Sequence, residues 1–185
     1  STFTYDGLNR VTQVSYNTVS GVSTAPTVSY VFDYDSTYGT AADGMVVRVN
    51  VGTDYQERYT FDSSFQVAST IHTIGSRTYT TSCTRNQASQ PTQWTYPSSR
   101  PINVSHDSIG RVTGILEGGN GPTWLSSVTY NNIGQMTADA LGNGVTEHYG
   151  YDANRMQLTS QKAGTASPYT NRMDLTYSYS ATSAQ

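Results

Sequence analysis

His106-Asp107-Ser108-Ile109-Gly110-Arg111-Val112 and Tyr130-Asn131-Asn132-Ile133-Gly134-Gln135-Met136 are two copies of one seven-residue motif. Its first residue is aromatic or His, its second Asp or Asn, its fifth Gly or Asn, its sixth Arg or Gln, and its seventh apolar. An Asp or Asn at the start of a type I turn accepts backbone N–H bonds, and a Gly takes the left-handed conformation that a bulged hairpin requires. The motif therefore predicts a hairpin turn.

The motif recurs along the whole chain. A third clear copy runs from Tyr5 to Val11, with Asn9 in the left-handed position, because Asn tolerates that conformation. The starts at residues 61, 85, 106, 130 and 151 are 24, 21, 24 and 21 residues apart, and one diverged copy is expected near Tyr34. A period of this kind indicates a repeat architecture.

The weaker copies predict departures from the pattern. The copy at Phe61 has no Gly, and the copy that begins at Tyr151 and ends at Met156 is interpreted as one residue short. In the copy at Arg85 the seventh residue is Pro91, which predicts an irregular or edge region because Pro cannot donate to a β-ladder.

Between the motifs, side chains alternate as they do in half-buried strands. Val28 and Tyr30 alternate with Ser29, and a second turn signal such as Gly142-Asn143-Gly144 lies halfway between motifs. The sequence therefore predicts an all-β fold, a continuous antiparallel meander of about a dozen strands that forms a curved sheet strip. We expect one domain over residues 1–185, as part of a longer repeat array.

Composition narrows the function classes. The chain has 15 Val but 6 Leu, with 28 Thr and 23 Ser, which excludes an all-helical fold. Its 15 Tyr are expected to supply the burial that Leu and Ile do not. Its 10 basic and 13 acidic residues form no runs, so nucleic acid is not an expected partner. No apolar stretch approaches the roughly 18 residues of a membrane span, and Cys83 has no partner for an internal disulfide.

The Tyr-Asp and Gly-Arg pairs, on a period of 21 to 24 residues, resemble the YD repeat of the RHS family. The resemblance covers nearly the whole chain, although Thr37 to Gly52 and Cys83 to Gln93 match poorly. It implies a β-sheet strip that winds into a hollow shell, as in bacterial polymorphic toxins, wall-associated proteins, the encapsulating component of insecticidal toxin complexes, and teneurins. Family members that enclose a toxin end in a self-cleavage motif with Asp-Pro, which is missing from this sequence, so autoproteolysis is not assigned.

The resemblance implies a structural, non-catalytic function: a segment in the wall of a secreted, RHS-like encapsulating protein, located outside the cell or at its surface. Its expected partners are further YD repeats of the same chain, with a toxin cargo as a further option. No residue is assigned to catalysis, a metal or a cofactor, and the chain is not expected to be an enzyme. The residues expected to set turns and strand register are Tyr5, Asp6, Arg10, Asp62, Asp107, Gly110, Arg111, Asn131, Gly134, Tyr151 and Asp152.

Several groups of reactive residues do not have the arrangement that a chemical site requires. His72, His106, His148 and Cys83 are not at metal-ligand spacing. Adjacent strand residues point to opposite faces, so Ser105, His106 and Asp107 are not expected to form a triad. Asp33 and Asp35 share one strand face and are expected to be solvated there rather than to bind a cation or to act as the carboxylate pair of a glycosidase. Gly118 to Gly121 is interpreted as a hairpin turn.

Two other functions remain open. Leu175 to Ser180 still alternates near the end of the sequence, and unpaired edge strands seek partners, so identical copies could pair through sheet edges into an extracellular filament. Alternatively, exposed Tyr, Trp94 or Trp124 could bind surface glycans in a carbohydrate-binding or adhesion module. For the Tyr stripe, packing in a core is favoured over sugar stacking. Asn103 is a formal glycosylation acceptor.

Overall fold

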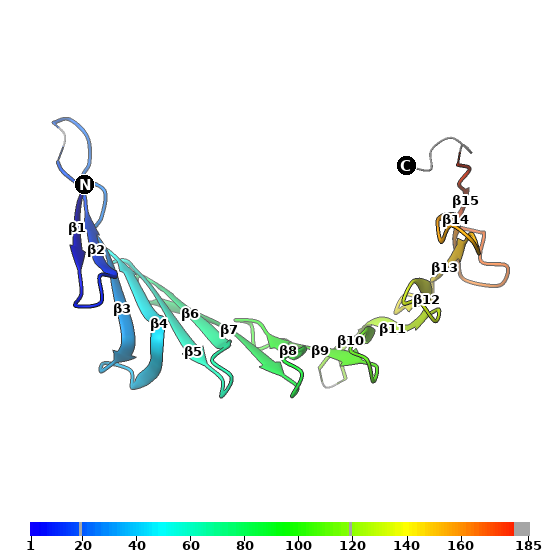
Figure 1. The fold of residues 1–185 in the computed structure, drawn as a ribbon, viewed down its shortest axis with the longest axis horizontal. Helices are drawn as coiled ribbons and strands as arrows, with labels where there is room; N and C mark the ends of the chain where they lie inside the picture. The colour runs from blue at the N-terminus through cyan, green and yellow to red at the C-terminus, as the bar shows by residue number, and fades with distance from the viewer. Residues whose placement is uncertain (19, 119, 180–185) are drawn as a thin grey trace. The chain divides into compact units, whose positions relative to one another are not determined.

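The computed structural model describes residues 1–18, 20–118 and 120–179, and its regular elements are all β-strands (Figure 1). Gly119 of the predicted loop and Ser180 of the predicted last strand lie outside the described residues. The strands are β1 (Thr2–Tyr5), β2 (Val11–Ser15), β3 (Val28–Asp35), β4 (Thr40–Val51), β5 (Tyr55–Phe61), β6 (Val67–Ile74), β7 (Arg77–Arg85), β8 (Pro91–Thr95), β9 (Pro101–His106), β10 (Val112–Glu117), β11 (Thr123–Tyr130), β12 (Met136–Leu141), β13 (Thr146–Tyr151), β14 (Leu158–Gly164) and β15 (Met173–Thr176).

The strands form one 15-stranded sheet in which their spatial order equals their order in the chain. Consecutive strands pair antiparallel, as in Tyr30 opposite Val49 between β3 and β4. The predicted all-β antiparallel meander is confirmed, and the predicted motifs fall between strands rather than within them.

The chain divides into two compact units. Unit 1 comprises residues 1–84 and 94–99, and unit 2 comprises residues 85–93 and those from 100 onward. Strands β1 to β7 lie in unit 1 apart from the last residue of β7, and β9 to β15 lie in unit 2.

The two faces of the sheet in unit 1 differ in chemistry, as strand alternation requires. One face carries Tyr30 and its partner Val49. The other carries a row of polar side chains, in which the Asn50 amide donates to the Ser29 hydroxyl (3.1 Å) and the Gln56 amide donates to the Asn50 carbonyl oxygen (3.0 Å). Cross-strand hydrogen bonds of this kind stabilise a sheet face without apolar packing.

The described residues of neither unit form a conventional hydrophobic core. Among the described residues, the fully buried apolar ones are Ala42, Val47, Cys83 and Ala163, all of them small. The expectation that the tyrosines pack into a core is wrong for Tyr34 and Tyr179, because 56% and 45% of their surface is exposed. A large side chain becomes fully buried only between two layers, and the described strands supply one layer.

In a meander, alternate connections lie at the same edge. The motif turns β1–β2 and β5–β6 therefore share one edge in unit 1, and the motif turns β9–β10, β11–β12 and β13–β14 share one edge in unit 2. We call this the turn edge of each unit.

Candidate functional site

The motif turns are the most regular feature of the structure. In the first one, the Asp6 N–H donates to the Arg10 carbonyl (3.0 Å) and the Asn9 N–H donates to the Asp6 carbonyl (3.1 Å). One Asp6 carboxylate oxygen also accepts the N–H groups of Leu8 and Arg10, each at 2.9 Å. The second residue of the motif thus satisfies the backbone donors of the turn, as the sequence predicts.

The same side-chain cap recurs at four further turns, in which the second residue is Asp62, Asn86, Asp107 or Asn131. In the charged caps these bonds also affect acidity. Hydrogen bonds from the backbone N–H and the side chain of the sixth residue lower the pKa of Asp6 and Asp107. Both carboxylates are therefore held in their charged form.

The fifth residue of each of these turns has a left-handed backbone. The φ angles are 61° at Asn9, 58° at Phe65, 63° at Ser89, 90° at Gly110 and 89° at Gly134. Phe65 is bulky and takes this conformation at a steric cost. The turn geometry is therefore imposed by its hydrogen bonds even where the sequence lacks Gly.

The sixth residue pairs with the second in matched chemical types. The Arg10 Nε lies 2.7 Å from the Asp6 carboxylate, and Arg111 and Asp107 repeat that pair at 2.7 Å. At two other turns both residues are amides: Asn86 donates to the Gln90 side chain (3.0 Å) and Asn131 donates to the Gln135 side chain (2.8 Å). In the turn at Phe61 the two types are mixed, because the second residue is the carboxylate Asp62 and the sixth is the amide Gln66. The sequence pattern shows each of the two positions separately but gives no sign that they pair.

The sixth side chain also reaches the next turn along the turn edge. The Gln90 amide donates to the Gly110 carbonyl (2.8 Å), and the Gln135 amide donates to the Met156 carbonyl (2.7 Å). In both pairs the accepting residue is the left-handed one of the following turn. One side chain therefore fixes its own turn and the spacing to the next.

Where the sixth residue is Arg, its guanidinium contacts the next hairpin through an ion pair or over an aromatic ring. The Arg10 guanidinium donates two hydrogen bonds to Asp33, at 2.9 and 2.6 Å, and lies 4.4 Å from the centre of the Phe32 ring. Arg111 lies 4.3 Å from the centre of the Tyr130 ring, the first residue of the next motif. These are favourable cation–π distances.

The first residue of the motif makes a second inter-turn contact. The hydroxyls of Tyr130 and Tyr151 donate to the carbonyls of Val112 and Met136, each at 2.8 Å, and the accepting residue is the seventh of the preceding motif. Tyr179 makes the same bond to the Leu158 carbonyl (2.8 Å). These bonds explain why Tyr, rather than Phe, occupies the first position in these copies.

We call the bonds from one motif turn to the next the turn ladder. A second recurring feature is a β-bulge beside the turn. After five of the motif turns the strand has one extra residue, as between the pairs Tyr5 opposite Val11 and Thr4 opposite Gln13. The extra residues are Thr12, Ala68, Thr113 and Thr137, each directly after the seventh motif residue, and Thr159, directly after Leu158 in the longer copy. Such β-bulges increase the twist of the strand next to the turn.

Two predicted irregularities are wrong. The copy at Tyr151 is one residue longer than the motif, because the Asp152 N–H donates to the carbonyl of Gln157 and Met156 takes the left-handed position, with φ 57°. The turn before Pro91 is regular, because the bonds from Asn86 hold it and Pro91 begins strand β8.

The expectation of a solvated Asp33 and Asp35 is also wrong. Asp33 takes a left-handed backbone, accepts the Gly44 N–H (2.7 Å) and pairs with Arg10. Asp35 is 2% exposed, caps the diverged turn by accepting the Thr37 N–H (3.0 Å), and pairs with Arg48 (3.4 Å). Alternation alone places both on an open face, but the shifts in register beside Asp33 rearrange this hairpin.

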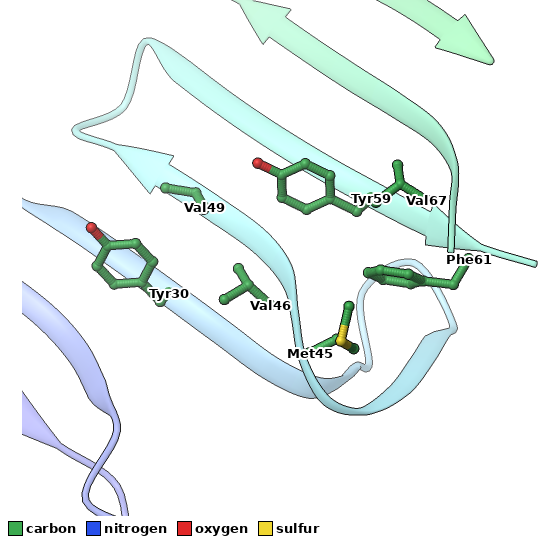
Figure 2. A pocket seen from close by; sticks show the side chains of 7 residues that line it. All are labelled: Tyr30, Met45, Val46, Val49, Tyr59, Phe61 and Val67. Carbon is green, nitrogen blue, oxygen red and sulfur yellow. The ribbon is translucent and has the colours of Figure 1, made fainter. Parts of the chain in front are cut away.

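The aromatic face of unit 1 contains an open apolar hollow of about 440 Å³ (Figure 2). Figure 2 shows that its side chains lie on one side of the sheet. They belong to Tyr30, Met45, Val46, Val49, Tyr59, Phe61 and Val67. A neighbouring hollow shares Tyr30 and Val46 and continues to Phe3, Val11, Val14 and Phe32. This face is therefore an extended apolar surface.

A carboxylate lies among tyrosines at the border of this face. The Tyr55 hydroxyl contacts Glu57 (3.2 Å) and the Nδ1 of His72 (2.9 Å). Burial, followed by a hydrogen bond to Glu57, raises the pKa of Tyr59 to about 12. These phenols remain protonated and donate to the carboxylate.

Unit 2 has a comparable cluster with two carboxylates. Asp139 and Glu147 lie directly opposite each other on β12 and β13, and the Tyr149 hydroxyl donates to Glu147 (2.5 Å). Asp139 is 9% exposed, and burial followed by repulsion from Glu147 raises its pKa. Like charges opposite each other destabilise a strand pair.

The remaining candidates show no assembled chemistry. Within the described ranges, no three His, Cys, Asp or Glu side chains are grouped as metal ligands. The His148 ring lies 4.5 Å from the Tyr169 ring, Cys83 is buried, and Asp107 is engaged in its turn. No part of the chain that the structure describes forms a helix long and apolar enough to span a bilayer.

No protein-family model matches the chain, and no curated protein matches its sequence. Solved structures do match its fold. A crystal structure of TcdB2-TccC3-Cdc42 superimposes with a TM-score of 0.79 and 19% identity, covering 97% of this chain and 10% of that one. TcdB2-TccC3 without its hypervariable C-terminal region gives 0.77 and 18%, with the same coverage. The Photorhabdus luminescens Tc holotoxin pore gives 0.75 and 18%, covering 92% of this chain and 9% of that one. The chain thus shares the fold of a segment of Tc toxin components and spans about a tenth of their length.

Proposed function

We propose that the chain is a structural, non-catalytic segment in the wall of a secreted, RHS-like encapsulating protein. The observation that carries this proposal is the turn ladder on a single-layer sheet. The ladder connects the first motif turn to the next hairpin in unit 1 and each motif turn from Gln90 to Met156 to the following one in unit 2, without the support of a second layer.

A wall must separate two spaces and hold its shape while only one layer thick. Side-chain bonds such as Gln135 to the Met156 carbonyl stiffen the turn edge of such a layer, because the strand pairing between consecutive hairpins lies toward the ends away from the motif turns. The extended apolar face of unit 1 is typical of a surface that faces an enclosed volume or another molecule. The match to segments of Tc toxin components supports the same role.

The proposal assigns the motif residues to structure. Asp6, Arg10, Asp107 and Arg111 have their charged groups engaged in turns or the ladder, which leaves them unsuited to bind and release a substrate. Further YD repeats of the same chain would be the partners of the sheet edges, and a toxin would be the enclosed cargo.

The test is electron microscopy of the native full-length protein, combined with the mass of its denatured polypeptide. We expect hollow particles and a polypeptide much heavier than 20.1 kDa. Fibres built from a polypeptide of about that mass would contradict the wall and support edge-to-edge assembly of identical copies. Compact particles without a lumen would contradict both.

A further inference from the structure

A second hollow, in unit 2, has a different chemistry. It has a volume of about 480 Å³ and lies where β11 begins and β12 ends, at the edge opposite the motif turns. Its lining residues are Pro122, Thr123, Trp124, Leu141, Gly142 and Asn143. We call it the Trp124 hollow. Its volume is within the ordinary range of small-molecule sites.

The backbone fixes the position of Trp124. Ile115 lies opposite Leu125 and Leu116 opposite Thr123, so Trp124 is the extra residue of a β-bulge. Bulges redirect side chains relative to the regular strand. As a result, 51% of the Trp124 surface is exposed.

Gly142 allows β11 and β12 to approach closely at Trp124. Its N–H donates to the Trp124 carbonyl (3.1 Å). A Cβ at this position would collide with the carbonyl of Thr123. The floor of the hollow therefore depends on a glycine, as is common where two backbones approach closely.

An ion pair between Arg100 and Glu117 lies beside the indole of Trp124. The Arg100 guanidinium lies 5.4 Å from the centre of the Trp124 ring and 2.7 Å from the Glu117 carboxylate. The guanidinium restricts the ring, while Glu117 balances its charge. The site is preorganised and has no excess charge.

The hollow also presents unused polar groups. The Asn143 side-chain oxygen accepts the Val145 N–H (3.0 Å), which fixes the side chain and leaves its NH2 group without an acceptor among the described residues. Within the same described part of the chain, the Thr123 hydroxyl is also without a partner. Together they offer an amide donor and a hydroxyl that can donate or accept.

We propose that the Trp124 hollow binds one pyranose ring of a neutral oligosaccharide. A pyranose has C–H groups that can lie on the exposed indole, and hydroxyls around its rim that both donate and accept hydrogen bonds. The charge balance between Arg100 and Glu117 favours a neutral sugar over an anionic one. The hollow of Figure 2 differs from the Trp124 hollow in being mainly apolar, since three valines, Phe61, Met45 and two tyrosines line it.

The chain has two tryptophans, Trp94 and Trp124, so each can report separately. In a Trp94→Phe protein the fluorescence comes from Trp124, and in a Trp124→Phe protein it comes from Trp94. We would titrate both with cellotetraose, maltotetraose and chitotetraose. At least one sugar should shift the emission of the Trp94→Phe protein in a saturable manner and leave the Trp124→Phe protein unchanged.

Asn143→Asp tests the polar contact without disturbing the turn. Aspartate keeps the oxygen that accepts the Val145 N–H but loses the donor, so the melting temperature should stay constant while affinity for the responding sugar falls about fivefold, the equivalent of one hydrogen bond. Asn132→Ala, an exposed position in a motif turn, is the control and should leave affinity unchanged.

Three outcomes would overturn the proposal. The first is no response of Trp124 to any of the three sugars at millimolar concentration. The second is an equal response from the Trp94 reporter. The third is saturation by decaproline with no response to the sugars, which would identify a peptide groove instead.

Discussion

The Tyr130 hydroxyl donates a 2.8 Å hydrogen bond to the backbone carbonyl of Val112, which belongs to the preceding motif. We expect Tyr130→Phe to lower the free energy of unfolding by about 1 kcal/mol, because it removes one hydrogen bond and leaves the ring in place. Thermal melting measures the loss. Tyr34→Phe is the control, since no described residue pairs with the Tyr34 hydroxyl, and an equal loss there would contradict the role of the ladder.

Gly110 and Gly134 provide a matched pair. Both have φ near 90°, so replacing either by Ala should cost about 1 kcal/mol for the strained backbone. Only at Gly110 would the new Cβ also collide with the Gln90 side chain and break its bond to the turn, whereas the space around Gly134 is open. Gly110→Ala should therefore melt lower than Gly134→Ala. Equal melting temperatures would show that the Gln90 bond contributes nothing.

The matched turn pairs predict a compensated double substitution. Asp107→Asn or Arg111→Gln alone should lower the melting temperature, because each leaves a partner of the wrong type. The double variant recreates the pair that Asn131 and Gln135 form, and should melt closer to the parent than either single variant. A double variant that equals the sum of the two losses would show that the two positions act independently.

The Arg10 pair makes unit 1 sensitive to acid. Hydrogen bonds from Arg10, and then from the Gly44 N–H, lower the pKa of Asp33 to about 2. A lowered pKa means that the folded state binds the proton less readily, so this contribution is complete above pH of about 4 and is lost as the pH falls toward 2. Melting temperatures across this range should fall less steeply for Asp33→Asn than for the parent. An identical slope would contradict the pairing.

Asp139 should behave in the opposite way. Burial, followed by repulsion from Glu147, raises its pKa, so the folded state binds the proton more tightly and stability increases as the pH falls toward that pKa. Asp139→Asn should therefore melt higher than the parent at neutral pH, with the difference shrinking in acid. The control Asp43→Asn, at an exposed position, should show no such change. A lower melting temperature of Asp139→Asn at neutral pH would contradict the repulsion between Asp139 and Glu147.

The order of strands followed from the sequence because each motif specifies its own turn. Asp6, Asp107 and Asn131 bond to backbone groups two and four residues away, so a local pattern contained that information. The ladder could not be foreseen in the same way. The bonds from Gln90 to Gly110 and from Tyr130 to Val112 connect residues about 20 positions apart, and they depend on how neighbouring hairpins align.

The errors have physical causes. The apolar area of tyrosine predicts burial, yet a single layer leaves Tyr34 half exposed. Register shifts in the β3–β4 hairpin place Asp35 in a buried ion pair with Arg48, a position that strict alternation of side chains does not predict. In the last motif, the left-handed residue is Met156, a type that gives no sequence signal for that conformation.

Among the described residues of unit 2, the ladder joins consecutive hairpins only: Gln90 to the turn of Gly110, Arg111 to Tyr130, and Gln135 to the turn of Met156. Mechanical load along the strand order is therefore carried in series, as in a zipper. A sheet built in this way yields one hairpin at a time under tension, and a damaged turn weakens its two neighbours and nothing further.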